Sequence, residues 1–214
     1  MKRYLVALMV ICFFSVSAFA GTVYLYESSV SPGDSGTITF PVLGGVGGVL
    51  YGQYNLMISW NKDATYAPIS GFCVENAYST TVAGQEYEII PVSAMGPVYE
   101  SAAWIFSKYL GGGLSAQAAQ LAIWEVVFDS GAAYSLTGGN FYVGFSNGYV
   151  TEAQALLDAP IGTVTGGFAI AHNPVGSTNP TLYQDYVIHV PEPALPLLVG
   201  MGLLAVGLAW RRFS

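Results

Sequence analysis

One cysteine and one glutamine are the residues of this sequence whose types and positions could carry chemistry. Cys73 is unpaired in the mature chain, because Cys12 falls within an N-terminal segment that we expect to be removed on export. Gln120 is the one polar residue between Ala118 and Trp124. A buried glutamine costs free energy unless its amide is hydrogen-bonded, so the sequence predicts either an amide bonded to a neighbouring strand or an amide with a chemical role. For the cysteine, the alternatives are a small buried hydrophobic residue and a functional thiol.

The surroundings of these two residues resemble the thioester domains of bacterial surface adhesins. The segment Phe72–Glu75 is similar to their aromatic-Cys-Ile/Val segment, and Gln120–Trp124 is similar to their Thr-Gln-x-Ala-Ile-Trp segment, although Ala119 stands where the adhesins have threonine. The resemblance implies a bond between the Cys73 sulfur and the Gln120 carbonyl, formed with loss of ammonia. An outside amine or other nucleophile could then become covalently attached. This chemistry needs no cofactor and acts once per molecule, so we do not expect an enzyme.

Two other kinds of catalytic site fit the residue types. Residues 144–148 match G-x-S-x-G around Ser146, and His172 and His189 follow in the order of a serine hydrolase. That fold needs a helix directly after the serine, whereas we expect the next helix to begin at Thr151. A dyad of the lone cysteine with either histidine is a further alternative. No paired-histidine motif and no Asp-rich calcium loop occurs, so the sequence predicts no metal site.

The N-terminus has the three parts of a secretory signal. Lys2 and Arg3 give a positive start, residues 4–17 form a short apolar run, and Ala18-Phe19-Ala20 provides small residues at a cleavage site. We expect residues 1–20 to be removed, with cleavage between Ala20 and Gly21 after passage through the secretion translocon. A first transmembrane helix is the alternative, but the apolar run is short for one.

The C-terminus is similar to the PEP-CTERM sorting signal of Gram-negative bacteria. It begins with the short motif Val190, Pro191, Glu192, Pro193. An uncharged stretch follows at residues 194–210, and Arg211 and Arg212 form a basic pair at the chain end. The uncharged stretch predicts a transmembrane helix, and the arginines favour a cytoplasmic end. The resemblance implies processing by an exosortase and an association with exopolysaccharide and biofilms. The part of the chain between the two terminal signals, the body at residues 21–189, would then be anchored to the inner membrane from the periplasm before it reaches the cell surface or matrix.

The charges of the body exclude several classes of partner. Residues 21–189 contain twelve acidic residues and two basic ones, Lys62 and Lys108, for a net charge of −10. Binding to nucleic acid needs lysine and arginine for the phosphates, so this function is excluded. A peripheral role on an anionic membrane is excluded for the same reason.

The pattern of the body predicts one α+β domain, with a β-rich lobe and a small lobe of two to three helices. Segments rich in β-branched and aromatic residues predict strands at 22–26, 37–42, 56–60, 69–75, 86–92, 141–145 and 182–189. Turn and glycine signals predict a turn at 31–34 and a loop at 44–48. Helices are predicted at 99–110, 116–128 and 152–158, capped in the last two cases by Ser115 and Thr151.

Three functions therefore remain open from the sequence. The first is an exported adhesion or matrix protein that captures a surface amine or exopolysaccharide through a thioester. The second is a structural or exopolysaccharide-associated matrix protein without a covalent bond, in which Cys73 and Gln120 are simply buried. The third is a secreted serine hydrolase, whose ester turnover would depend on Ser146.

Overall fold

The structure is a computed structural model that describes residues 21–40, 44–62, 65–75, 84–129, 133–174 and 183–190. The predicted signal segment with Ala20 lies outside the described residues. So do most of the sorting motif (Pro191, Glu192, Pro193), the predicted transmembrane segment 194–210, Arg211 and Arg212. Within the described ranges, no helix combines the length and the apolar character needed to cross a membrane.

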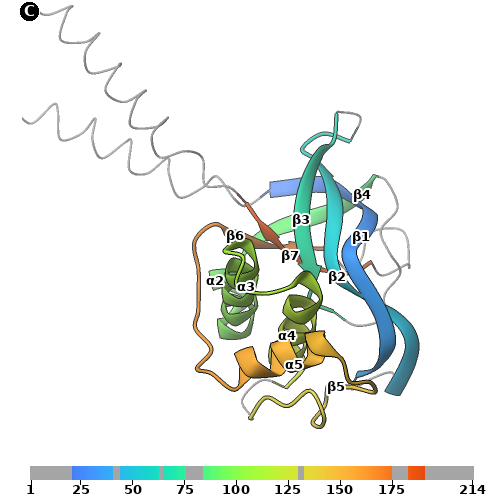
Figure 1. Ribbon diagram of the computed structural model, residues 1–214. Helices are drawn as coiled ribbons and strands as arrows, with labels where there is room; N and C mark the ends of the chain where they lie inside the picture. The colour runs from blue at the N-terminus through green and yellow to red at the C-terminus, as the bar shows by residue number, and fades with distance from the viewer. Residues whose placement is uncertain are drawn as a thin grey trace, which may run out of the picture.

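The described residues form an α+β fold, as the sequence predicts. The strands are β1 (Gly21–Phe40), β2 (Gly44–Ser59), β3 (Ala67–Cys73), β4 (Gln85–Pro91), β5 (Tyr142–Val143), β6 (Phe168–His172) and β7 (Tyr186–His189). The helices are α2 (Val92–Met95), α3 (Pro97–Leu110), α4 (Ala116–Phe128) and α5 (Gly148–Leu157). The helices gather on one side of the strands (Figure 1).

Six of the strands close into a ring in which every neighbouring pair is antiparallel. The pairing order is β2-β3-β7-β6-β4-β1, and β1 also pairs with β2 along most of its length. Closure depends on the start of β1, where Tyr24 and Leu25 pair with β2 on one side and with β4 on the other. β5 pairs with the distal part of β1. Closure covers both edges of the start of β1, whereas β1 beyond Leu25 and β2 before Tyr54 pair mainly with each other.

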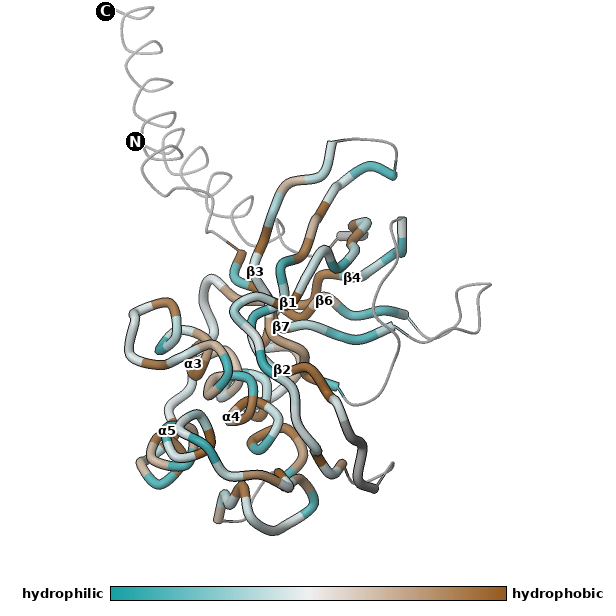
Figure 2. Tube along the Cα trace, turned by 45° about the vertical axis from the view of Figure 1, so that its right-hand side comes forward, coloured by the Kyte–Doolittle hydropathy of each residue, from teal (hydrophilic) through white to brown (hydrophobic). Residues whose placement is uncertain are grey.

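Helix α4 lies between the strands and the other helices, and this position explains its composition. It contacts α3 and α5 on one side and β1, β2 and β3 on the other, as the tube in Figure 2 shows. Every residue from Ala116 to Val126 is buried, including the polar residues Gln117, Gln120 and Glu125, because the helix is covered on all sides. Ser115 caps the helix by accepting a hydrogen bond from Ala118 N at 3.2 Å, as predicted.

Aromatic contacts fix the helices against the ring. The rings of Phe40 and Trp124 meet edge to face with centroids 5.4 Å apart, which joins β1 to α4. Phe72 meets Phe106 in the same geometry at 4.8 Å, which joins β3 to α3. Such pairs stabilise a fold by about 1 kcal/mol each beyond the area they bury. Phe72, which precedes Cys73, and Trp124, which is four residues after Gln120, are therefore both held in place.

Three local predictions were wrong, because tertiary pairing overrides turn and cap signals. β1 runs through residues 31–34 without a turn, and the extra residues there are absorbed as register shifts against β2. β2 begins at Gly44, so the glycine run predicted as a loop is part of a strand. Helix α5 begins at Gly148 with Asn147 as its cap, since Asn147 Oδ1 accepts from Val150 N at 3.0 Å; Thr151 lies inside the helix. β6 was not predicted.

Candidate functional site

Cys73 and Gln120, 47 residues apart in the chain, are in direct contact. Cys73 N donates a hydrogen bond to Gln120 Oε1 at 2.9 Å, and Gln120 Nε2 donates to Cys73 O at 2.8 Å. The cysteine is the last residue of β3, and the glutamine lies in the second turn of α4. Both residues are fully buried, with 0% exposure. The two elements that carry them lie side by side at the junction of ring and helices (Figure 1).

The thiol of Cys73 lies in apolar surroundings that keep it protonated. Its sulfur donates to Glu75 O at 3.0 Å. Burial raises the pKa of the thiol well above its usual range, although the bond to Glu75 and the indole N–H of Trp124 act in the opposite direction. A thiol in this state is a poor nucleophile until a base takes its proton.

Trp124 places a buried N–H donor beside the reactive pair. It follows Gln120 by four residues on α4 and therefore lies on the same face of the helix. Its Nε1 is buried and has no hydrogen-bond partner among the described residues, yet it is near enough to the Cys73 sulfur to favour the thiolate. An unpartnered buried donor costs free energy, so its position next to a sulfur suits a function that develops charge there.

The geometry allows acyl chemistry at the Gln120 carbonyl. Its oxygen already accepts from a main-chain N–H, and such a donor stabilises the oxyanion of a tetrahedral intermediate. The amide carbon lies between Oε1 and Nε2, both of which touch the main chain of the residue that carries the thiol. In this structure the Cys73 sulfur is hydrogen-bonded to Glu75 O and not to the Gln120 amide. The same two hydrogen bonds also satisfy the alternative prediction, in which the amide bonds to a neighbouring strand.

A cluster of acids and a histidine lies next to the thiol. Asp185 accepts from Asn173 N at 2.7 Å, and its other oxygen lies 2.6 Å from His172 Nδ1. Burial raises the pKa of Asp185, and the contact with His172 lowers it in part. Burial and the nearby negative charge of Asp185 raise the pKa of Glu75 to about 7. Glu75 can therefore both accept and donate a proton at neutral pH, two residues from the thiol.

A cavity of about 270 Å³ opens next to this cluster. Glu75 and Trp124 line it, and so do Tyr54, Glu27 and Gln184. Cys73 and Gln120 themselves do not line it, because the residues of its floor cover them. The exposed side chain of Leu50 lies at its rim. The cavity thus comes near the Cys73–Gln120 pair through Glu75 and Trp124, without reaching it.

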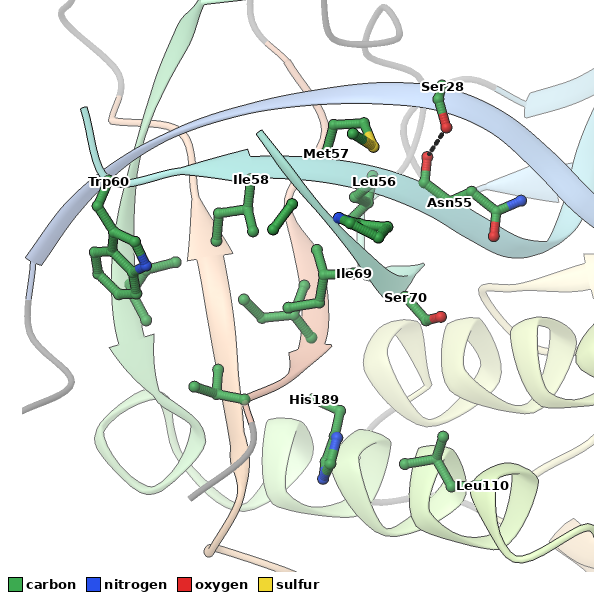
Figure 3. A pocket seen from close by; sticks show the side chains of 15 residues that line it. Ser28, Asn55, Leu56, Met57, Ile58, Trp60, Ile69, Ser70, Leu110 and His189 are labelled. Carbon is green, nitrogen blue, oxygen red and sulfur yellow. Dashed lines mark hydrogen bonds between the residues drawn. The ribbon is translucent and has the colours of Figure 1, made fainter. Parts of the chain in front are cut away.

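A larger hollow of about 500 Å³ lies elsewhere, over β2, β3 and β7 (Figure 3). Trp60 lies at one end of it in this view, and His189 and Leu110 lie toward the other. Most of its walls are aliphatic, and none of the groups that could act on the thiol faces it. Groups that affect the pKa of the thiol, Glu75 and Trp124, line the smaller cavity instead.

The structure does not bring the predicted hydrolase residues together. His172 is hydrogen-bonded to Asp185, and within the described part of the chain no hydrogen bond joins Ser146 to either histidine. His189 stacks against the ring of Phe168 at 5.1 Å. Neither histidine is hydrogen-bonded to Cys73. Among the described residues, no group of three or more His, Cys, Asp or Glu could hold a metal ion.

The sequence did not reveal the group that surrounds the pair. Asp185 and His172 come from segments about 100 residues after Cys73, and nothing in their spacing points to the thiol. The sequence signal for this group was the position of Glu75, two residues after Cys73. Comparisons with family models, curated proteins and solved structures gave no match. The function of this chain is therefore inferred from the geometry of the site.

Proposed function

We propose that this chain is an exported protein of the cell envelope or biofilm matrix that attaches covalently to a surface nucleophile through a thioester between Cys73 and Gln120. The observation that carries the proposal is the pair of hydrogen bonds, at 2.9 and 2.8 Å, between the Gln120 amide and the main chain of the single described cysteine. The two residues are 47 positions apart in the chain, and the sequence alone indicates both as candidates for the bond.

The proposed bond forms without an oxidant. The Cys73 sulfur attacks the Gln120 carbonyl carbon, the C–N bond breaks, and the amide nitrogen leaves as ammonia after taking up the thiol proton. The Cys73 N–H stays on the carbonyl oxygen throughout the reaction. Complete burial protects the product, because a thioester is hydrolysed when water reaches it.

The proposed location follows from the two ends of the chain. A secretory signal at residues 1–20 and a sorting signal at 190–214 would place the body in the periplasm and then at the surface or in the matrix. The exosortase and the secretion translocon would be its partners during export. The start of β1 and the end of β7 lie near each other at one end of the ring, which suits a body held at that end (Figure 1).

The intact mass of the exported protein tests the proposal. A folded protein with the bond is lighter than its composition by one ammonia, and Cys73→Ala and Gln120→Ala each abolish that deficit. Addition of methylamine should replace the deficit with a methylamine adduct and release one thiol. The full mass in freshly made, folded protein would end the covalent mechanism.

Alkylation of the folded protein is not a sufficient test. Cys73 is fully buried and its thiol is held protonated, so it resists alkylation whether or not the bond exists. The two cases separate only after rapid denaturation, when a free cysteine reacts at once and a thioester does not.

The second candidate is a matrix protein held by noncovalent contacts. It is favoured by the fact that the Gln120 amide is already satisfied by its two main-chain bonds, so its burial does not require a covalent role. In that case the mass is complete and the larger hollow with Trp60 is the surface to test for sugar binding.

A further inference from the structure

The hollow of about 500 Å³ over β2, β3 and β7 is mostly aliphatic. Leu56 of β2 pairs directly with Ile69 of β3, and both line the hollow together with Ile188 of β7. Among the described residues of its lining there is no lysine, arginine, aspartate or glutamate, although the body contains twelve acidic residues. Contact of apolar surface with water is unfavourable in proportion to its area, so a partner that covers the hollow would be favoured.

Two large apolar side chains are exposed at the ends of this hollow. Trp60, directly after β2, is 56% exposed, and Leu110, the last residue of α3, is 48% exposed. Trp60 lies at one end and Leu110 toward the other (Figure 3). The side chain of tryptophan combines a large apolar ring with one N–H donor, and tryptophan is therefore enriched where hydrocarbon meets water.

The two basic residues of the body flank these exposed side chains in the sequence. Lys62 is two residues after Trp60, and Lys108 is two residues before Leu110. Both lysines are exposed, and Lys108 Nζ lies 4.8 Å from the centre of the Trp104 ring. The body therefore places its few positive charges near the ends of an apolar hollow, where they can reach phosphate groups.

The described chain ends beside this hollow. Val190, the last residue that the structure describes, lines it, and Val190 N donates to Gly167 O at 2.9 Å. The stretch at 194–210, which the sequence predicts to cross the membrane, begins four residues later. Because four extended residues span at most about 14 Å, the proposed anchor would hold the edge of the hollow close to the bilayer.

Two of the few polar residues in the lining are already hydrogen-bonded within the protein. Ser28 Oγ donates to Asn55 O at 2.8 Å. Asn55 Nδ2 donates to Ser29 Oγ at 3.0 Å and to Ser31 O at 3.2 Å. Asn55 Oδ1 accepts from Gln53 Nε2 at 2.7 Å. A bound sugar would compete with these bonds, whereas an acyl chain needs none, so the lining favours an apolar partner.

We propose that this hollow is the face with which the anchored body lies on the lipid bilayer. Trp60 and Leu110 enter the headgroup region, acyl chains cover the aliphatic lining, and the two lysines contact lipid phosphates. The inference rests on the membrane anchor of the proposed function, and it adds the orientation in which that anchor holds the body. It needs no anionic lipid, because the anchor and not the charge of the body brings the hollow to the bilayer.

Quenching of tryptophan fluorescence by brominated lipid tests this contact. The exported protein, with its C-terminal segment retained, is placed in phosphatidylcholine vesicles with or without bromine near the headgroup end of the acyl chains. The chain has four tryptophans, Trp60, Trp104, Trp124 and Trp210, and the difference between wild type and W60F isolates the signal of Trp60. Bromolipid should reduce that signal at least about twofold, and iodide in the water should leave it nearly unchanged.

A charge at the rim of the hollow should move Trp60 away from the lipid. Leu110 is about half exposed, so L110E changes the rim without emptying the core, and it should lower the quenching of Trp60 at least about threefold. Leu50, which is 51% exposed at the rim of the smaller cavity, provides the matched control. L50E should leave the quenching of Trp60 as it is in the wild type.

Trp210, within the predicted membrane segment, separates this inference from the proposed function. Its signal is the difference between W60F and W60F/W210F. Quenching of Trp210 without quenching of Trp60 leaves the anchor intact and overturns the contact with lipid. An effect of L50E as large as that of L110E overturns the contact as well, and so does protection of Trp60 by a soluble polysaccharide in place of bromolipid. Quenching of neither tryptophan overturns the anchor and, with it, this inference.

Discussion

The stability of Cys73→Ala distinguishes a covalent link from a hydrogen-bonded contact. A thioester would close a loop between residues 73 and 120, which are 47 positions apart. A cross-link of that length lowers the entropy of the unfolded chain and stabilises the fold by about 4 kcal/mol in the chain-entropy treatment. C73A removes this contribution completely.

Without the covalent bond, the same substitution has a small effect. The two hydrogen bonds use the main-chain N–H and C=O of residue 73, and alanine keeps both. The loss is then that of one buried sulfur, about 1 kcal/mol. In that uncrosslinked case Gln120→Ala is more damaging than C73A, because it leaves both main-chain groups buried without a partner, at a cost of about 3 kcal/mol.

Urea unfolding followed by tryptophan fluorescence measures the difference. With a slope of about 2 kcal/mol per M, a loss of 4 kcal/mol lowers the midpoint by about 2 M, against about 0.5 M for the hydrogen-bonded case. The measurement is made at pH 6, where an unfolded thioester hydrolyses slowly. Wild-type protein opened with methylamine is the matched control, because it keeps every residue and loses only the cross-link. It should unfold at nearly the same urea concentration as C73A.

Two results would refute this reasoning. One is a C73A midpoint within about 0.5 M of wild type, since a cross-link of 47 residues cannot be so weak. The other is a methylamine-treated protein as stable as the untreated one although its mass shows the adduct. The first result would make Gln120 a structural residue that joins α4 to β3, whereas the second would mean that the bond forms but does not stabilise the fold.

Two further predictions concern the elements that hold α4. Glu152 accepts from Ser115 N at 2.8 Å and from Ser115 Oγ at 2.5 Å, so E152Q should lower the free energy of unfolding by about 1–2 kcal/mol; a loss no larger than that of E88Q, a control at an exposed residue of β4, would contradict it. Burial, with a smaller contribution from nearby Asp129, raises the pKa of Glu125 to about 7 in the folded protein, against 4.5 as the ordinary value. The folded state then binds more protons than the unfolded chain between these values, so stability should fall as pH rises from about 4.5 to 7. E125Q should remove part of that fall in pH-dependent urea titrations, and an unchanged slope would show that Glu125 does not cause it.

The candidate pair could be read from the sequence because both residues break a local rule. A cysteine left unpaired after export and a glutamine within an apolar helix each require an explanation from composition alone. Helices α3 and α4 were likewise predictable, since their caps and glycine stops are local signals: Gly111 ends α3 and Ser115 begins α4. Their bounds depend on neighbouring residues in the chain.

Features that depend on long-range pairing could not be predicted from local signals. β1 continues through residues 31–34 because β2 supplies partners there, and no local pattern contains that information. The same holds for β6, which lies between the distant strand β4 and β7, the next strand in the chain. The closure of the ring is a property of the pairing order and not of any segment.

The sequence by itself determined the chemistry that this protein has available: one thiol outside the predicted signal segment, one glutamine within an apolar helix, an acidic body and two terminal segments with the features of export and sorting signals. Only the tertiary structure decided where those groups lie. It placed the Gln120 amide on the main chain of Cys73 and brought Asp185 and His172 to Glu75 from segments about 100 residues away. The reason is physical. Residue types set which bonds can form, whereas distances and burial between remote segments depend on how the closed ring and the helices pack together.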